Sequence, residues 1–158
     1  MIMYVKIMVP LDGSELAECV FPHLETIAKG CGVKNVILVR AVEPFYVPQY
    51  VYASVVSAIS SKEVDAENKA QAKKYLDGVV SRLNLKGAQI KTEVIMGKPA
   101  EVLADYATKN KVDLIVIATH GRSGVSRWVW GSVADRILRA ACTAVFMVRA
   151  PGCIPGIQ

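Results

Sequence analysis

Apolar residues gather in short continuous runs along this chain. Four of these runs are rich in β-branched residues: Tyr4–Val9, Val36–Val42, Leu114–Ala118 and Ala144–Val148. Continuous apolar runs are typical of parallel strands that are covered on both faces of a sheet. A fifth run, Ile90–Met96, is closer to an alternation of apolar and polar residues, which predicts a half-exposed strand at the edge of the sheet.

The segment after the first run has the period of a helix. Its apolar face is formed by Leu16, Val20, Leu24 and Ile27. Ser14 is placed to act as the N-cap of this helix, and Gly30 and Gly32 supply stop signals. Because Pro22 lies inside the pattern, we expect a helix that is kinked at this residue.

Helical patterns also fill the later gaps between strands. The first of them covers Lys62–Asn84, with an apolar face formed by Ala72, Leu76, Val79, Val80 and Leu83. A second helix begins at Pro99, since proline is favoured at the first helical position. Its inward residues are Val102, Leu103, Tyr106 and Ala107. A last helix is predicted from Ser132 to Ala140, so strands and helices alternate along the chain.

Strict alternation predicts an α/β fold with right-handed crossovers and helices on both faces. We expect one Rossmann-like domain over residues 1–150, a doubly wound five-stranded parallel sheet in the order 3-2-1-4-5. In that order the ligand crevice lies between the carboxyl ends of the first and fourth strands. The long connection Pro44–Ser61 and the tail 151–158 have no periodic apolar face, so both are expected to be mobile.

Composition narrows the class of protein. The chain has 158 residues, 53% of them hydrophobic, and no apolar run approaches the length of a membrane span. Its net charge of +5 comes from scattered basic residues, which argues against a nucleic acid partner, while the lack of a membrane-length apolar run argues against a membrane partner. No export signal is recognisable at the N-terminus, and the four cysteines show no disulfide or zinc spacing. The sequence therefore predicts a cytoplasmic protein.

Asp12 follows the first strand, where the crevice should open. Its carboxylate could accept hydrogen bonds from a ribose or an adenine. It could equally cap the first helix or order the turn, and position alone does not decide between the two roles.

The loop after the fourth strand is rich in glycine. It runs from Ala118 through Gly121 and Gly124 to Gly131 and Ser132, which open the last helix. Backbone N–H groups and a positive helix end attract anions, so this segment is a candidate phosphate cradle. Ordinary turn glycines and an N-cap serine would explain the same pattern. The spacing matches neither a Walker loop nor a dinucleotide fingerprint.

From Val9-Pro10-Leu11-Asp12-Gly13-Ser14 to Ala144–Val148, the sequence closely resembles the universal stress protein family. ATP-binding members carry G-x2-G-x9-G-[S/T], and Gly121 with Gly131-Ser132 matches its second and third parts. Ala118 stands in place of the first glycine, which implies a methyl group beside the expected adenosine.

The resemblance implies a set of nucleotide-binding residues. Those that would line the adenine and ribose are Pro10, Asp12, Val42, Ile117, Ala118 and Thr119. His120 would position backbone beside the ribose or phosphates. Those that would hold the phosphates are Gly121, Gly131, Ser132 and Val133. The ligand implied is ATP, with AMP or another adenylate as alternatives, and Mg²⁺ or Mn²⁺ would bind through the phosphates.

These expectations lead to one main hypothesis about function and two alternatives. The leading hypothesis is an ATP-binding stress-response regulator, not an enzyme, with no catalytic residue and no metal site formed by protein side chains. A nucleotide-free interaction protein and a slow ATP hydrolase are the alternatives. We also expect a homodimer formed around Ala144–Val148, because this apolar strand would otherwise leave an exposed sheet edge; the resemblance points the same way.

Overall fold

The computed structural model describes residues 4–45, 61–119 and 132–150. Most of the connection Pro44–Ser61 and the tail 151–158 lie outside these residues, so their expected mobility stays a prediction. Within the described chain, no helix combines the length and the apolar character that a membrane crossing requires.

Five parallel strands form one sheet in the order β3-β2-β1-β4-β5. Their bounds are β1 Lys6–Pro10, β2 Asn35–Val42, β3 Gln89–Met96, β4 Leu114–Ala118 and β5 Ala144–Val148. The predicted strand order is confirmed, as is the position of Ile90–Met96 at an edge of the sheet.

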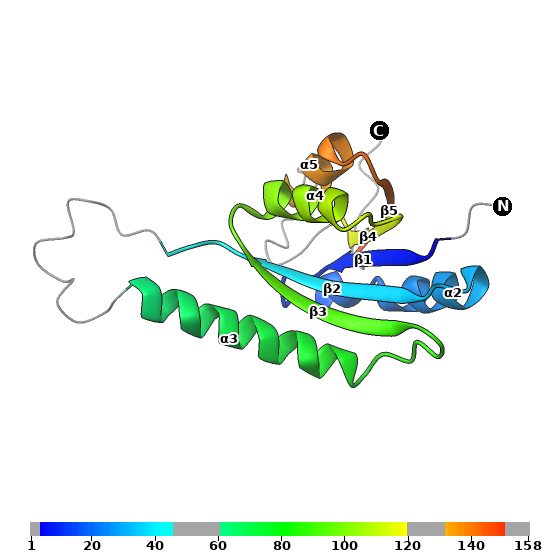
Figure 1. Ribbon diagram of the computed structural model, residues 1–158, viewed down its shortest axis with the longest axis horizontal. Coiled ribbons are helices and arrows are strands. Elements are labelled where there is room, and N and C mark those ends of the chain that lie inside the picture. The colour runs from blue at the N-terminus through cyan, green and yellow to red at the C-terminus, as the bar shows by residue number, and fades with distance from the viewer. Residues whose placement is uncertain (1–3, 46–60, 120–131, 151–158) are drawn as a thin grey trace, which may run out of the picture.

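Helices cover both faces of this sheet (Figure 1). Their bounds are α1 Glu15–Glu18, α2 Phe21–Cys31, α3 Ser61–Val80, α4 Pro99–Lys109 and α5 Ser132–Ala140. Buried residues of α1, α2 and α3 belong to one core cluster, and those of α4 and α5 belong to a second. The protein is therefore a three-layer, doubly wound α/β fold, as its alternating elements predict.

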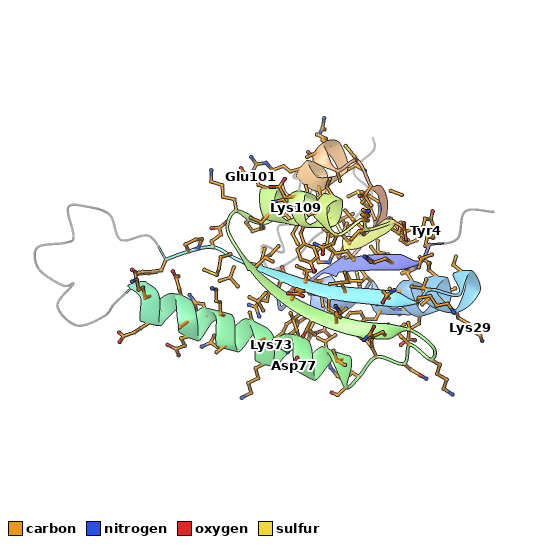
Figure 2. The ribbon with its side chains drawn as sticks, viewed as in Figure 1. Tyr4, Lys29, Lys73, Asp77, Glu101 and Lys109 are labelled. Atoms are coloured by element: carbon orange, nitrogen blue, oxygen red, sulfur yellow. The ribbon has the colours of Figure 1, made fainter. Side chains whose placement is uncertain are left out.

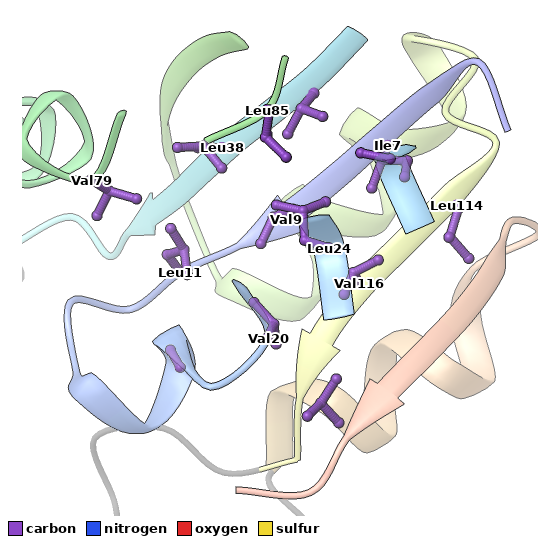
Figure 3. Packing of buried hydrophobic residues seen from close by; sticks show 14 of the residues in the cluster. Ile7, Val9, Leu11, Val20, Leu24, Leu38, Val79, Leu85, Leu114 and Val116 are labelled. Carbon is purple, nitrogen blue, oxygen red and sulfur yellow. The ribbon is translucent and has the colours of Figure 1, made fainter. Parts of the chain in front are cut away.

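The two clusters explain why the central strands read as continuous apolar runs. In β1, Ile7 and Val9 join the cluster under α1 to α3, whereas Met8 between them joins the cluster under α4 and α5. All three side chains are fully buried. Figure 3 shows Ile7 and Val9 packed beside Leu24 of α2 and Leu114 of β4. Each such side chain contributes about 1.5–3 kcal/mol relative to leaving it exposed.

The first helical segment differs from the prediction of one kinked helix. It is divided into two helices, because α1 ends at Glu18 and α2 begins at Phe21. Pro22 lies in the first turn of α2, where N–H groups have no intrahelical acceptor and a missing one costs little. Gly32 ends α2 with a left-handed φ of +63°, whereas Gly30 lies inside the helix.

The helix predicted over Lys62–Asn84 is also shorter than expected. α3 ends at Val80, and beyond it the chain tightens, since the N–H of Arg82 donates to the carbonyl of Val79 at 3.0 Å. By contrast, α4 begins at Pro99 and α5 spans Ser132–Ala140, as predicted.

Candidate functional site

The central strands part at the carboxyl edge of the sheet. β1 and β2 pair from Lys6↔Asn35 to Pro10↔Val39, and β4 and β5 pair along their full length. β1 and β4 pair only at Ile7↔Leu114 and Met8↔Ile115. The ladder therefore stops short of the ends of β1 and β4, which is where a doubly wound sheet opens a ligand crevice.

Pro10 explains why the ladder stops. The N–H of Leu11 donates to the carbonyl of Val39 on β2 at 2.8 Å. Successive N–H groups of a strand point to opposite neighbours, so the nitrogen of Pro10 faces β4. That nitrogen carries no hydrogen and cannot donate to β4. A proline at the end of β1 thus ends the hydrogen bonding between β1 and β4.

On the β1 side, Asp12 orders the turn into α1. Its Oδ1 accepts hydrogen bonds from the backbone N–H of Ser14 at 2.9 Å and from the Ser14 hydroxyl at 2.6 Å. Ser14 in turn accepts from the N–H of Ala17 at 3.2 Å, which confirms Ser14 as the N-cap. The turn-ordering role of Asp12 is thereby shown, while its contact with a nucleoside stays a prediction.

On the β4 side, the strand ends in buried residues. Ala118 is 7% exposed and packs within the cluster under α1 to α3, so it sits in the core. Thr119 is also buried, and its N–H donates to the carbonyl of Val148 at 2.8 Å. These contacts fix the point from which the chain leaves toward α5.

The fold brings together many of the predicted site residues. Those at the carboxyl ends of β2, β1 and β4 are Pro10, Asp12, Val42, Ile117, Ala118 and Thr119. Ser132 is the first residue of α5, and Val133, half-buried, packs against the cluster under α4 and α5. Since α5 links two parallel strands, it must run back across the sheet, and its N-terminus lies at the same edge.

Several predicted residues lie outside the described chain. They are His120, Gly121 and Gly131. Their contribution to a phosphate cradle therefore stays a prediction. Among the described residues, no group of three or more His, Cys, Asp or Glu side chains is placed to hold a metal ion.

Arg40 is a residue of this edge that the sequence analysis missed. It is the one charged residue of β2, and its guanidinium lies 5.3 Å from the centroid of the Tyr75 ring on α3. The same group lies close to the turn, because a Cβ on Gly13 would meet guanidinium atoms of Arg40 at 3.0–3.2 Å. In the sequence, the feature that could have indicated this role is a single arginine inside an apolar strand.

The strand order and the helices on both faces of the sheet define the doubly wound α/β class of proteins. A family model described as the universal stress protein family matches residues 3–149. The chain is 33% identical over 151 residues to universal stress protein MJ0531 of Methanocaldococcus jannaschii, covering 94% of this chain and 84% of that protein. The chain therefore belongs to the universal stress protein family.

Solved structures agree with this fold. The structure of MJ0577, from the same organism, matches with a TM-score of 0.79 and 23% identity over 96% of this chain and 99% of that chain. A universal stress protein in complex with cAMP matches with a TM-score of 0.62 and 23% identity, over 94% of this chain and 98% of that chain.

Two further matches also have a nucleotide bound. The universal stress protein of Archaeoglobus fulgidus in complex with dAMP has a TM-score of 0.62 at 21% identity, over 92% of this chain and 98% of that chain. A family protein of Arabidopsis thaliana with AMP bound has a TM-score of 0.64 at 16% identity, over 94% of this chain and 93% of that chain.

Proposed function

We propose that this protein binds an adenine nucleotide, ATP in the first place, in the crevice between the ends of β1 and β4. The observation that carries the proposal is the early end of β1–β4 pairing, with the Asp12 turn on one side and Thr119 leading toward α5 on the other. The binding of cAMP, AMP and dAMP by structural neighbours supports an adenylate as the ligand.

In this proposal the two sides of the crevice have different tasks. The Asp12 turn and the end of β4 contact the nucleoside, while the N-terminus of α5, with Gly131 and Ser132, holds the phosphates through its N–H groups. Mg²⁺ or Mn²⁺ binds through the phosphates, because a triphosphate offers the oxygen ligands that these ions prefer.

We further propose a regulator located in the cytoplasm, not an enzyme. Hydrolysis needs a group that orients water beside the terminal phosphate. Asp12 is the carboxylate of the β1–α1 turn, and its two hydrogen bonds with Ser14 suit it to holding that turn. Binding of ATP would then act by ordering the site rather than by chemistry.

The experiment is equilibrium dialysis with ATP, AMP and cAMP, run beside an assay of phosphate release from ATP. Saturable binding with no turnover above background is the expected result. Turnover that scales with protein concentration would favour the hydrolase alternative. An absence of binding by all three nucleotides in a folded protein would refute the proposal and favour a nucleotide-free interaction protein.

A further inference from the structure

α1 is too short to be stable as an isolated helix. It has only the four residues Glu15–Glu18, which is less than two helical turns, and isolated helices of this length are not stable in water. It nevertheless follows directly on the Asp12–Ser14 turn at the crevice. Contacts with other elements must therefore fix both the helix and the turn.

The last residue of α1 is anchored to α3 and to the turn after α3. Glu18 accepts hydrogen bonds from the Tyr75 hydroxyl at 2.9 Å and from two nitrogens of Arg82 at 2.8 and 2.9 Å. The hydrogen bond from Arg82 lowers the pKa of Glu18, while burial raises the pKa of Tyr75. At neutral pH the carboxylate and the phenol thus keep the protonation states that these bonds need.

Tyr75 also contacts Arg40, which lies beside the turn that precedes α1. The guanidinium lies over the Tyr75 ring and against the backbone of Gly13, between α3 and the turn. Gly13 has a φ of +91° and no Cβ, so the flat group can cover its Cα closely. Tyr75 therefore fixes Glu18 directly and the Asp12–Ser14 turn through Arg40.

We infer that Arg40, supported by Tyr75, is a positioning residue that holds the Asp12–Ser14 turn in the conformation that binds the nucleoside. The inference rests on the proposed function. Arg40 shares its face of the sheet with α3, since Val36 and Leu38 at alternate positions pack in that cluster. α5, where the phosphates are expected, covers the opposite face (Figure 1). The geometry thus favours an action through the turn over a direct phosphate contact.

The first test needs no nucleotide. In Arg40→Met the amides of Ser14 and Ala17, which bond to Asp12 and Ser14, should exchange hydrogen about tenfold faster than in the wild type. The amide of Leu24 in α2 should be unchanged. Lys73→Met is the matched control, because Lys73 bonds to Asp77 on α3 (Figure 2) and to Thr92 on β3, and not to the Asp12–Ser14 turn. Unchanged exchange at Ser14 and Ala17 in Arg40→Met would overturn the inference.

The second test measures the affinities of adenosine, AMP and ATP by calorimetry. Arg40→Met should weaken the affinity for each of the three ligands by the same factor. We expect about tenfold, which is within the range for residues that are energetically coupled through direct contact. Lys73→Met should bind like the wild type. A loss that is absent for adenosine and grows with the number of phosphates would overturn positioning in favour of direct contact. If the wild type binds none of the three, the proposed function fails, and the exchange test alone decides the role of Arg40.

Discussion

The ring of His23, in the first turns of α2, packs against the ring of Phe146 on β5, with centroids 5.7 Å apart and the planes tilted by 48°. Despite this contact Phe146 remains 39% exposed. β5 carries no charged residue, whereas β3 at the opposite edge carries Lys91 and Glu93, which discourage strand pairing. This difference favours β5 over β3 as the surface of the homodimer that the sequence analysis expects.

We predict that the wild type is a homodimer and that Phe146→Lys is a monomer, because the substitution places a charge in the apolar edge that a second copy would cover. Light scattering at micromolar concentration measures the mass. Val5→Lys is the control, since Val5 is also exposed but precedes the central strand β1. A wild-type protein that is monomeric under these conditions would contradict the prediction.

Ser14→Ala removes two contacts at once, the N-cap of α1 and the hydroxyl that donates to Asp12. We expect the free energy of unfolding in urea to fall by about 0.5–2 kcal/mol, the range for lost N-caps. The affinity for adenosine should fall as well, because Asp12 loses a partner that orients it. Ser14→Thr keeps the hydroxyl and should restore both quantities. Wild-type stability in Ser14→Ala would show that the cap is not needed.

Ala118→Gly tests the position at which the chain departs from the glycine of the family motif. Because the methyl group packs in the core cluster, its removal should lower the free energy of unfolding by about 0.5–1 kcal/mol. The affinity for ATP should change by less than about twofold, equivalent to a few tenths of a kcal/mol. An affinity that rises about tenfold or more would instead place the methyl group against the nucleoside.

Gly131→Val and Ser132→Ala separate backbone from side-chain contacts with phosphate at the start of α5. The valine side chain should block the approach of a phosphate to the backbone and abolish most ATP binding. Ser132→Ala removes one hydroxyl donor and should cost roughly 1–3 kcal/mol of binding free energy. Dialysis measures both, with circular dichroism to confirm folding. Undiminished ATP affinity in a folded Gly131→Val protein would refute the phosphate-cradle assignment.

Glu18 should make the free energy of unfolding depend on pH in the acid range. Its pKa lies below the ordinary value of 4.5, mainly through the hydrogen bond from Arg82. A carboxyl group whose pKa is lowered by folding contributes stability that is present above its unfolded pKa and is lost as the pH falls through its folded pKa. Below pH 4.5 the wild type should therefore lose unfolding free energy more steeply than Glu18→Gln. Glu101→Gln, at an exposed residue of α4, should follow the wild type, whereas parallel curves for all three proteins would contradict the role of Glu18.

Much of the fold could be predicted because it depends on local periodicity. Continuous apolar runs identified four strands and an apolar–polar alternation the fifth, while the alternation of strands and helices identified the doubly wound layers. Ser14 and Pro99 marked helix starts because capping and proline preferences act within one helical turn. The rule that ligands bind at the carboxyl ends of the strands in this class of sheet indicated where to expect the site, and the binding itself stays a prediction.

Other features were decided only by tertiary structure. The sequence predicted one helix kinked at Pro22, but the folded chain has two helices, with the break just before Phe21. It could not reveal that Arg40 covers Gly13, or that Tyr75 bonds to Glu18, because these partners are far apart along the chain. Periodicity tells which residues are buried, but the contacts between layers depend on how the helices pack on the sheet. Those contacts, which hold the turn at the crevice, became visible only in the folded chain.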